Sequence, residues 1–246
     1  MDKSIDQIIE ELRQIVEKES KSGSSLALFA ALYLQVTIRV KQGIRNHEFE
    51  NGIRMEQLDV IFADRYIQAY RAFRDHKPIT AAWRVAFESE RKPLLILQHL
   101  LLGMNAHINL DLGIAAAQTM KGKDLYLLKN DFNAINRILS AMSDDVQQKI
   151  GKASPLLGML DRLAGRSDTL LVNFSITQAR DGAWKSAGEF HKSDSFNSLL
   201  VQRDKTVSNL ALSLVYPNSR RVRMVLNAIR LAETRDVAKV VRLIAG

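Results

Sequence analysis

The fold of this chain is decided by residues 98–112, which read QHLLLGMNAHINLDL. The run is mostly apolar, as in a buried helix, yet it carries two histidines, two asparagines and an aspartate. Burying a polar group is costly unless the group is paired or binds something. The stretch is therefore either an internal hydrogen-bond network or the wall of a binding site, and the pattern leaves both readings open.

The remainder of the chain also has the spacing of helices, and no stretch shows the sustained alternation of a β-strand. Ser4 and Gln7 form a capping box that opens a first helix. Pro93 suits the first turn of the helix that holds the polar stretch. We therefore predict an all-α single domain over residues 1–246, a multi-helix bundle around a central polar-containing helix at about 93–120. Other helices are expected at about 5–18, 26–43, 55–75, 80–87, 124–142, 167–191 and 194–216, with short basic helices from about 219 and 234.

Composition and length narrow the class of protein. At 246 residues, 46% of them hydrophobic, the chain is long enough for a sizeable core. It has no cysteine, which excludes disulfides, thiolate metal sites and a cysteine nucleophile, and which fits a reducing, cytoplasmic compartment. Its first residues lead into a charged amphipathic helix rather than an apolar signal segment. The apolar run Leu26–Val40 contains Arg39 and is shorter than the roughly 20 residues of a membrane span, so no transmembrane segment is expected.

Positive charge is concentrated near the end of the chain. The formal net charge is +8, and residues 200–246 hold nine Lys and Arg against three Asp and Glu, a difference of +6. A basic face of this kind can attract nucleic acid or anionic lipid. A basic helix surface is more often simply solvated, so the sequence favours that interpretation and does not exclude nucleic acid.

The polar stretch contains a candidate metal site. At about 100° per residue, His99, His107 and Asp111 follow one stripe of the helix, and the last two lie one turn apart. A helix supplies two ligands to a divalent metal such as zinc, iron or manganese in this way, so all three are candidate ligands of one ion. Asn105, a candidate catalytic residue, and Asn109, a candidate pocket residue, form a second stripe facing another neighbour. Alternatively, His107 bonds Asp111 and both support packing, or they line a metal-free pocket.

A cation falls within the apolar face of the helix predicted at 55–75. Arg65 lies among apolar positions there, beside Tyr66, a candidate pocket residue. A buried cation needs a carboxylate partner or an anionic ligand, and Asp111 is a candidate partner. Arg65 is therefore a candidate catalytic residue that would hold an anionic group. The alternative is that its side chain reaches out to solvent at the edge of the face.

Two further helices offer candidate residues at core-facing positions. Tyr33 and Thr37 share one face, so they are candidate pocket residues, although Thr37 can also bond a backbone carbonyl one turn earlier. Arg180 and Trp184 lie one turn apart at the edge of an apolar stripe. They could stack as a cation–π pair, bind an anion as catalytic and pocket residues, or simply pack at the edge of the core.

Several of these residues fall in blocks that resemble a known family. The segment NAHINLDL, with the preceding His99, resembles the signature of an uncharacterised bacterial and fungal family, the domain of unknown function 5995. The resemblance covers about residues 25–190, supports a single domain and implies no activity, because the family has none established. The basic C-terminal helices at about 200–246 lie outside it. Its other blocks are Tyr33 with Thr37, residues 62–66 (FADRY), Trp83 with Phe87, and Arg180 with Trp184.

A more distant likeness is to the all-helical zinc phospholipase C and P1-type nucleases, which also use His-x3-Asp pairs on helices. This chain has only five histidines, too few for a trinuclear zinc site of that kind. The likeness allows one metal ion, or two at most.

Three functions remain as hypotheses. The first is a metal-dependent hydrolase in which the metal activates water and Arg65 or Arg180 holds an anionic phosphoester or lipid-like substrate. The second is a non-enzymatic helical module that binds a small polar or lipid-like ligand at its centre. The third is a structural network with an interaction surface on the basic C-terminal helices.

Overall fold

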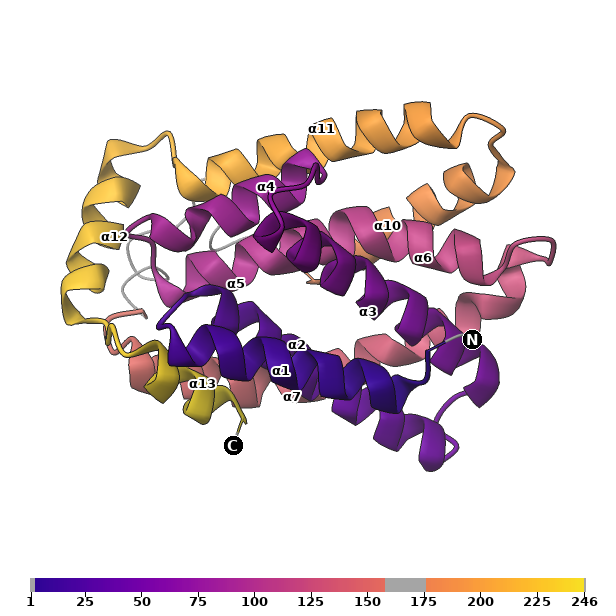
Figure 1. Cartoon of the computed structure of the whole chain (residues 1–246), viewed down its shortest axis with the longest axis horizontal. Helices are drawn as coiled ribbons and strands as arrows, with labels where there is room; N and C mark the ends of the chain where they lie inside the picture. Colours follow the sequence, from indigo (N-terminus) through magenta and orange to yellow (C-terminus); the bar gives the residue numbers. More distant parts are fainter. Residues whose placement is uncertain (1–2, 158–175, 246) are drawn as a thin grey trace.

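The computed structural model describes residues 3–157 and 176–245, and within these ranges the secondary structure is helical with no strand. This confirms the all-α, multi-helix prediction. Most of the helices lie along one another in an elongated bundle (Figure 1). The first helix opens at Ser4 with the capping box expected from its sequence. The N-terminal helices are α1 (Ile5–Lys21), α2 (Leu26–Arg45), α3 (Gly52–Arg74) and α4 (Ala81–Glu88), followed by the short 3₁₀ helix η1 (Ser89–Arg91).

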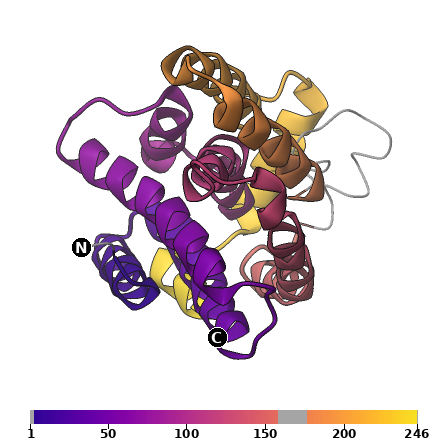
Figure 2. The ribbon, with the colours of Figure 1, turned by 90° about the vertical axis from the view of Figure 1, so that its right-hand side faces the viewer.

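The central helix consists of three consecutive segments and is surrounded by the others. They are α5 (Ile96–Met104), the π-helix η2 (Asn105–Asp111) and α6 (Leu112–Thr119). Viewed from one end of the bundle, this helix lies in the middle of the ring of other helices (Figure 2). Helix α2 packs on α5, α3 and α10 on α6, and α11 on η2. The predicted central polar-containing helix is therefore present.

The predicted start of the central helix at Pro93 is wrong. The helix begins at Ile96, and Pro93 lies before it in a short non-helical segment, where the Leu94 N–H donates to the Lys92 carbonyl oxygen at 2.8 Å. The Leu95 backbone N–H donates to the Gln98 side chain at 3.0 Å, and the Ile96 N–H donates to the Glu233 carboxylate at 3.0 Å. A contact from the far end of the chain thus helps to fix this helix start, so the local sequence could not show it.

The C-terminal half completes the bundle and brings the end of the chain back to its beginning. The predicted helix at 124–142 is longer than expected, and the predicted start near 167 lies outside the described residues. The last helix packs on α1, α2 and α7, beside the N-terminal helices (Figure 1). The described elements are η3 (Leu125–Leu128), α7 (Lys129–Ala153), α10 (Ile176–Lys192), α11 (Phe196–Val215), α12 (Arg220–Ala232) and α13 (Val237–Ala245).

Two local features bring aromatic side chains to the central helix. A Cβ atom at Gly103 would lie 2.3 Å from Cγ of Phe29, so only glycine lets α2 and α5 approach this closely. At the start of α4, the Asp204 carboxylate accepts the Ala81 and Ala82 N–H groups at 2.7 and 2.8 Å. This tie to α11 fixes α4, which carries Trp83 into the core.

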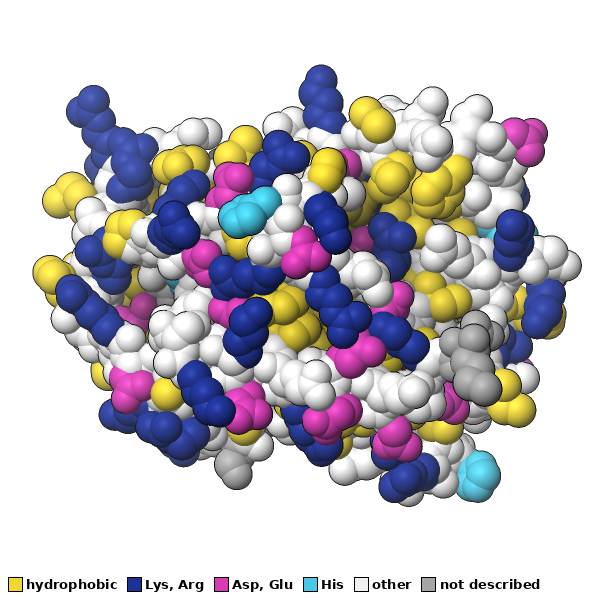
Figure 3. Space-filling view, viewed as in Figure 1, with side chains coloured by type: hydrophobic (Ala, Val, Ile, Leu, Met, Phe, Trp, Pro, Cys, Tyr) yellow, Lys and Arg dark blue, Asp and Glu magenta, His cyan; other side chains and the backbone are white. Residues whose placement is uncertain are grey.

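The segment Ile96–Thr119 is long and apolar enough to cross a membrane by length and composition alone, but 89% of its most apolar window is buried inside the protein. That burial is the property of a core helix in this bundle. On the face shown in Figure 3, Lys and Arg side chains are interspersed with Asp and Glu over much of the surface. A mixed surface of this kind favours the interpretation of the basic residues as a solvated face.

Candidate functional site around His107

Within the polar stretch 98–112, residues Asn105–Asp111 form a π-helix rather than an α-helix. Such segments are rare and occur often at functional sites, because the wider turn displaces side chains from the regular helical stripe. His107 Nδ1 lies 3.7 Å from Asp111 Oδ2, which is too long for a hydrogen bond. The predicted pair is thus brought close together but not bonded.

His107 is buried among aromatic rings that offer it no hydrogen bond. The residue is only 2% exposed, and neither ring nitrogen has a hydrogen-bond partner. The Phe62 ring stacks on the imidazole with centroids 3.5 Å apart, and the Tyr33 ring meets it edge-on at 4.3 Å. Phe29 approaches at 5.8 Å. Burial lowers the pKa of His107, with Asp111 offsetting part of this effect, so the imidazole is neutral near pH 7.

Asp111 is fully engaged with protein groups. Arg65 Nε donates to Asp111 Oδ1 at 2.8 Å, and Trp83 Nε1 donates to Asp111 Oδ2 at 2.8 Å. Burial acts to raise the pKa of Asp111, but the Arg65 charge and these hydrogen bonds hold it below its ordinary value. The carboxylate is therefore ionised and neutralised by Arg65, the partner that the sequence suggested.

A second unsatisfied pair lies beside His107. The Tyr33 hydroxyl is buried without a partner, while Thr37 donates to the Tyr33 carbonyl oxygen at 3.1 Å, the backbone bond anticipated for it. Asp59 Oδ2 is also buried without a partner. Burial, with a smaller contribution from the charge of Glu56, raises the pKa of Asp59 to about 8. Burial and the charge of Asp59 raise the pKa of Tyr33 well above 10. Asp59 lies one turn before Phe62 on the same face of α3, and the Phe62 ring meets the Tyr33 ring edge-on at 5.9 Å.

Asp59 is a site residue that was not predicted, although the sequence carries a signal for it. Met55, Asp59, Phe62 and Tyr66 recur at intervals of four, three and four residues, so the aspartate falls on the buried face of α3. A carboxylate at such a buried position needs a partner or a ligand, as the buried cation of Arg65 does. Tyr66 itself is 1% exposed and meets the Phe29 ring edge-on at 5.2 Å, within the group of rings around His107.

The two asparagines of the central helix face a different neighbour, as predicted. Asn105 Nδ2 donates to the Val207 carbonyl of α11 at 3.0 Å, and Asn109 Nδ2 donates to Asn105 Oδ1 at 3.0 Å. Arg203 of α11 donates to the Asn109 carbonyl oxygen at 2.8 Å. These bonds join the central helix to α11, so the structure places both asparagines in an internal network apart from the aromatic rings around His107.

Arg180 and Trp184 lie apart from His107, on α10, and contact α7. Arg180 is buried, donates to the Asn136 side chain and the Phe132 carbonyl, and stacks over the Phe132 ring at 4.5 Å. Burial lowers the pKa of Arg180 to about 10. Trp184 instead receives the Lys129 ammonium at 4.3 Å. Each of the two side chains therefore has its cation–π partner on α7, in place of the Arg180–Trp184 pair that was one of three alternatives. These contacts agree with the alternative of packing at the edge of the core.

The metal ligand set stays a prediction. Within residues 3–157 and 176–245, no three His, Asp or Glu side chains gather closely enough to hold a metal ion. His99 is half-buried on α5, where burial lowers its pKa to about 4, and it is not among the rings that contact His107. His107 and Asp111 supply two neighbouring donors, but the oxygens of Asp111 already accept bonds from Arg65 and Trp83.

The fold and this site define a class of all-helical protein with a partly unsatisfied polar centre. Residues 5–217 match the model of a family of unknown function (DUF5995), and the chain belongs to this family. The match is longer than the resemblance at about 25–190 suggested, since it runs from α1 to the end of α11. Helices α12 and α13 lie beyond it. No curated protein and no solved structure matches the chain.

Proposed function

We propose that this protein is a helical binding module that takes up a small, uncharged polar molecule at His107. The observation that carries the proposal is that both ring nitrogens of His107 are buried without a hydrogen-bond partner. The Tyr33 hydroxyl and one oxygen of Asp59, which lies one turn before Phe62 on α3, share this property.

The free-energy cost of burying these groups without partners favours a ligand-binding role over a purely structural one. Each unsatisfied buried polar group costs about 1–3 kcal/mol, and a whole domain is stable by only about 5–15 kcal/mol. An apolar side chain at position 107 would pack among the rings without that cost. A ligand or water that bonds to the imidazole would remove the cost and explain the histidine.

The charges around the site favour an uncharged ligand. Arg65 and Asp111 neutralise each other, and burial keeps His107 neutral. Asp59, with its pKa near 8, is mainly protonated at pH 7. The neutral imidazole offers one donor and one acceptor, and Tyr33 and protonated Asp59 each offer a hydroxyl. These hydrogen-bond donors and acceptors suit an alcohol or an amide as the ligand. A free anion would find no unpaired cation among these groups.

Access to the site runs past Phe62. Phe62 and Arg65 are only partly buried, whereas Tyr33, Tyr66 and Trp83 are at most 4% exposed. Phe62 therefore lies between the imidazole and solvent, and stacks directly on it. Entry of a ligand therefore requires this ring to move aside.

The test is to identify what the purified protein carries. Untagged protein is denatured, and the released small molecules are measured by mass spectrometry and the metals by elemental analysis. We expect a near-equimolar uncharged polar compound in the wild type and in His47→Leu, an exposed loop histidine, but not in His107→Leu. If nothing is released, and no compound of a panel of small alcohols and amides raises the Tm of wild type by more than it raises the Tm of His107→Leu, the proposal is wrong.

A metal-dependent hydrolase is the second candidate, and the same experiment separates it. It is favoured by the closeness of His107 and Asp111, and opposed by the bonds that Arg65 and Trp83 make to Asp111. Near-equimolar zinc, iron or manganese that disappears in His107→Leu would support the hydrolase and overturn the binding module.

A further inference from the structure

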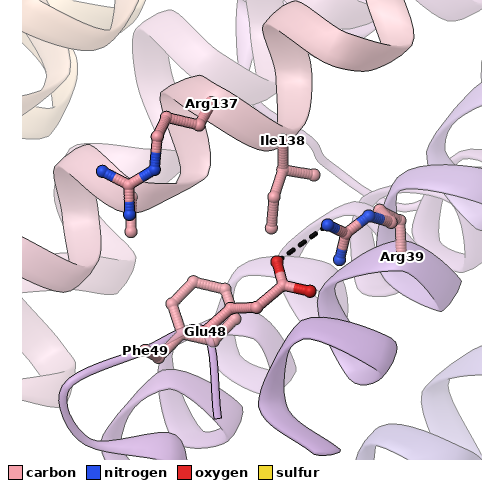
Figure 4. Close-up of a pocket in the computed structure, with 6 residues that line it drawn as sticks. Arg39, Glu48, Phe49, Arg137 and Ile138 are labelled. Carbon is pink, nitrogen blue, oxygen red and sulfur yellow. Dashed lines mark hydrogen bonds and ion pairs between the residues drawn. The ribbon is translucent and has the colours of Figure 1, made fainter. Parts of the chain in front are cut away.

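A second polar site lies on another side of the bundle, in a small pocket of about 90 Å³. It opens between α2, the segment before α3, and α7 (Figure 4). A space of this size holds several water molecules or a ligand of a few heavy atoms. Its lining consists of Arg39, Glu48, Phe49, Ala134, Arg137 and Ile138.

Arg39 has one terminal nitrogen engaged and the other unsatisfied. Its Nη2 donates to Glu48 Oε2 at 2.7 Å, while its Nη1 is buried without an acceptor. Figure 4 shows the Arg39 guanidinium directed toward Glu48 in the pocket. A guanidinium nitrogen that is held in place without an acceptor is available to donate a hydrogen bond to an oxyanion.

Arg137 supplies a second guanidinium from the opposite side of the pocket (Figure 4). Its side chain is exposed and has no hydrogen bond or ion pair with any described residue. The bond from Arg39 lowers the pKa of Glu48, and the charges of Arg39 and Arg137 contribute. Glu48 is therefore ionised, and the three side chains leave one positive charge uncompensated.

The rest of the lining is apolar. Phe49, Ala134 and Ile138 are each less than 9% exposed. Phe49 is seated against Gly43, where a Cβ atom would lie 2.9 Å from the ring. This apolar wall beside two guanidinium groups fits a molecule with an anionic head and a short hydrocarbon part.

We infer that this pocket binds a short-chain carboxylate, held by Arg39 Nη1 and the Arg137 guanidinium, with its alkyl group against Phe49, Ala134 and Ile138. The planar guanidinium matches the geometry of a carboxylate better than a point charge does. The inference is independent of the His107 site, which contains neither arginine and no residue of α7.

The test is an NMR titration of the full chain with butyrate at constant ionic strength, with butylamine and inorganic phosphate as parallel probes. We expect saturable shifts of the Phe49, Ala134 and Ile138 amides with butyrate, and none with butylamine. Arg137→Gln should weaken butyrate binding about tenfold by removing one charge-assisted contact. Arg221→Gln, which removes an exposed arginine of α12, is the matched control and should leave binding unchanged.

Four results would overturn the inference. Butyrate shifts that do not saturate would show that no site exists, and saturation by phosphate alone would assign the pocket to another anion. If Arg137→Gln and Arg221→Gln weakened butyrate binding equally, the loss of affinity would reflect the net charge of the protein and not a contact in the pocket. Ala134→Leu fills the pocket while leaving both arginines in place, so unchanged butyrate affinity in this variant would place the binding elsewhere.

Discussion

Two buried polar clusters in this protein differ in how many of their polar atoms have hydrogen-bond partners. One surrounds His107 at the centre of the bundle, and the other surrounds Glu19, which is 1% exposed at the end of α1. Both contain carboxylates and tyrosines in the interior. Their hydrogen bonds differ, and that difference separates a structural cluster from a candidate binding site.

In the Glu19 cluster, all four carboxylate oxygens of Glu19 and Glu90 accept a hydrogen bond. Tyr70 donates to one oxygen of Glu19 and Arg74 to the other. Arg74 also donates to both oxygens of Glu90, at 3.3 and 3.0 Å, and Ser24 donates to Glu90 at 2.8 Å. Although Arg74 Nε has no acceptor, this cluster ties α1, α3 and η1 together from within the protein.

The His107 cluster is satisfied on one side only. Asp111 has Arg65 and Trp83, whereas His107, Tyr33 and Asp59 retain unpaired polar atoms. The Glu19 cluster therefore contributes stability, and the His107 cluster retains hydrogen-bonding capacity at the expense of stability. Functional sites commonly show this trade-off.

The largest effect is expected from breaking the Glu19 cluster. Arg74→Met leaves Glu19 buried without its cation, and should lower the free energy of unfolding by about 3–5 kcal/mol. Arg71→Met, on the same helix, removes only a half-exposed ion pair with Glu11 and should cost less than about 1 kcal/mol. Urea unfolding measures both, and equal losses would contradict a structural role for the cluster.

The next effect is a pH dependence that arises from Asp59. Burial raises its pKa to about 8, so the folded protein retains a proton that the unfolded chain has released well below pH 6.5. Raising the pH from 6.5 to 8 therefore favours unfolding, and should cost about 1.5 kcal/mol. Asp59→Asn should abolish this decline in urea unfolding, whereas Asp75→Asn, at an exposed position, should retain it. A decline of the same size in Asp59→Asn would contradict the assignment.

A smaller effect of opposite sign is expected at His107. In ligand-free, refolded protein, His107→Leu removes two unsatisfied nitrogens and should raise the free energy of unfolding by about 1 kcal/mol. His191→Leu is the matched control, because His191 Nε2 lies within hydrogen-bond distance of the Met120 and Lys123 carbonyl oxygens. It should destabilise the protein. A loss of stability in His107→Leu as large as in His191→Leu would show that the imidazole is structural.

The smallest effect is expected at the Tyr33 hydroxyl, for which Tyr70 serves as the comparison. Tyr33→Phe removes a buried hydroxyl without a partner, and should change the free energy of unfolding by no more than about 0.5 kcal/mol. Tyr70→Phe removes the donor to Glu19 and should cost about 1–3 kcal/mol. If both variants lost the same stability in thermal unfolding, the distinction between the two clusters would fail.

Part of the site followed from the sequence because it depends on burial patterns. Arg65 fell on an apolar helix face, and a buried cation requires a counter-charge, so its pairing with Asp111 could be anticipated. Asp59 also falls on the buried face of α3, so its burial follows from the same pattern. By contrast, nothing local to Arg180 or Trp184 indicated that each would find its partner on α7.

The sequence by itself determined the all-α class, the capping box at Ser4 and the central position of the polar helix. These depend on periodicity and on hydrogen bonds within a few residues, which a linear chain displays directly. Only the tertiary structure decided where that helix begins, that its polar part becomes a π-helix, and which polar atoms remain unpaired. These depend on groups that meet across distant helices, as Glu233 meets Ile96 and Phe62 meets His107, and sequence spacing carries no information about such meetings.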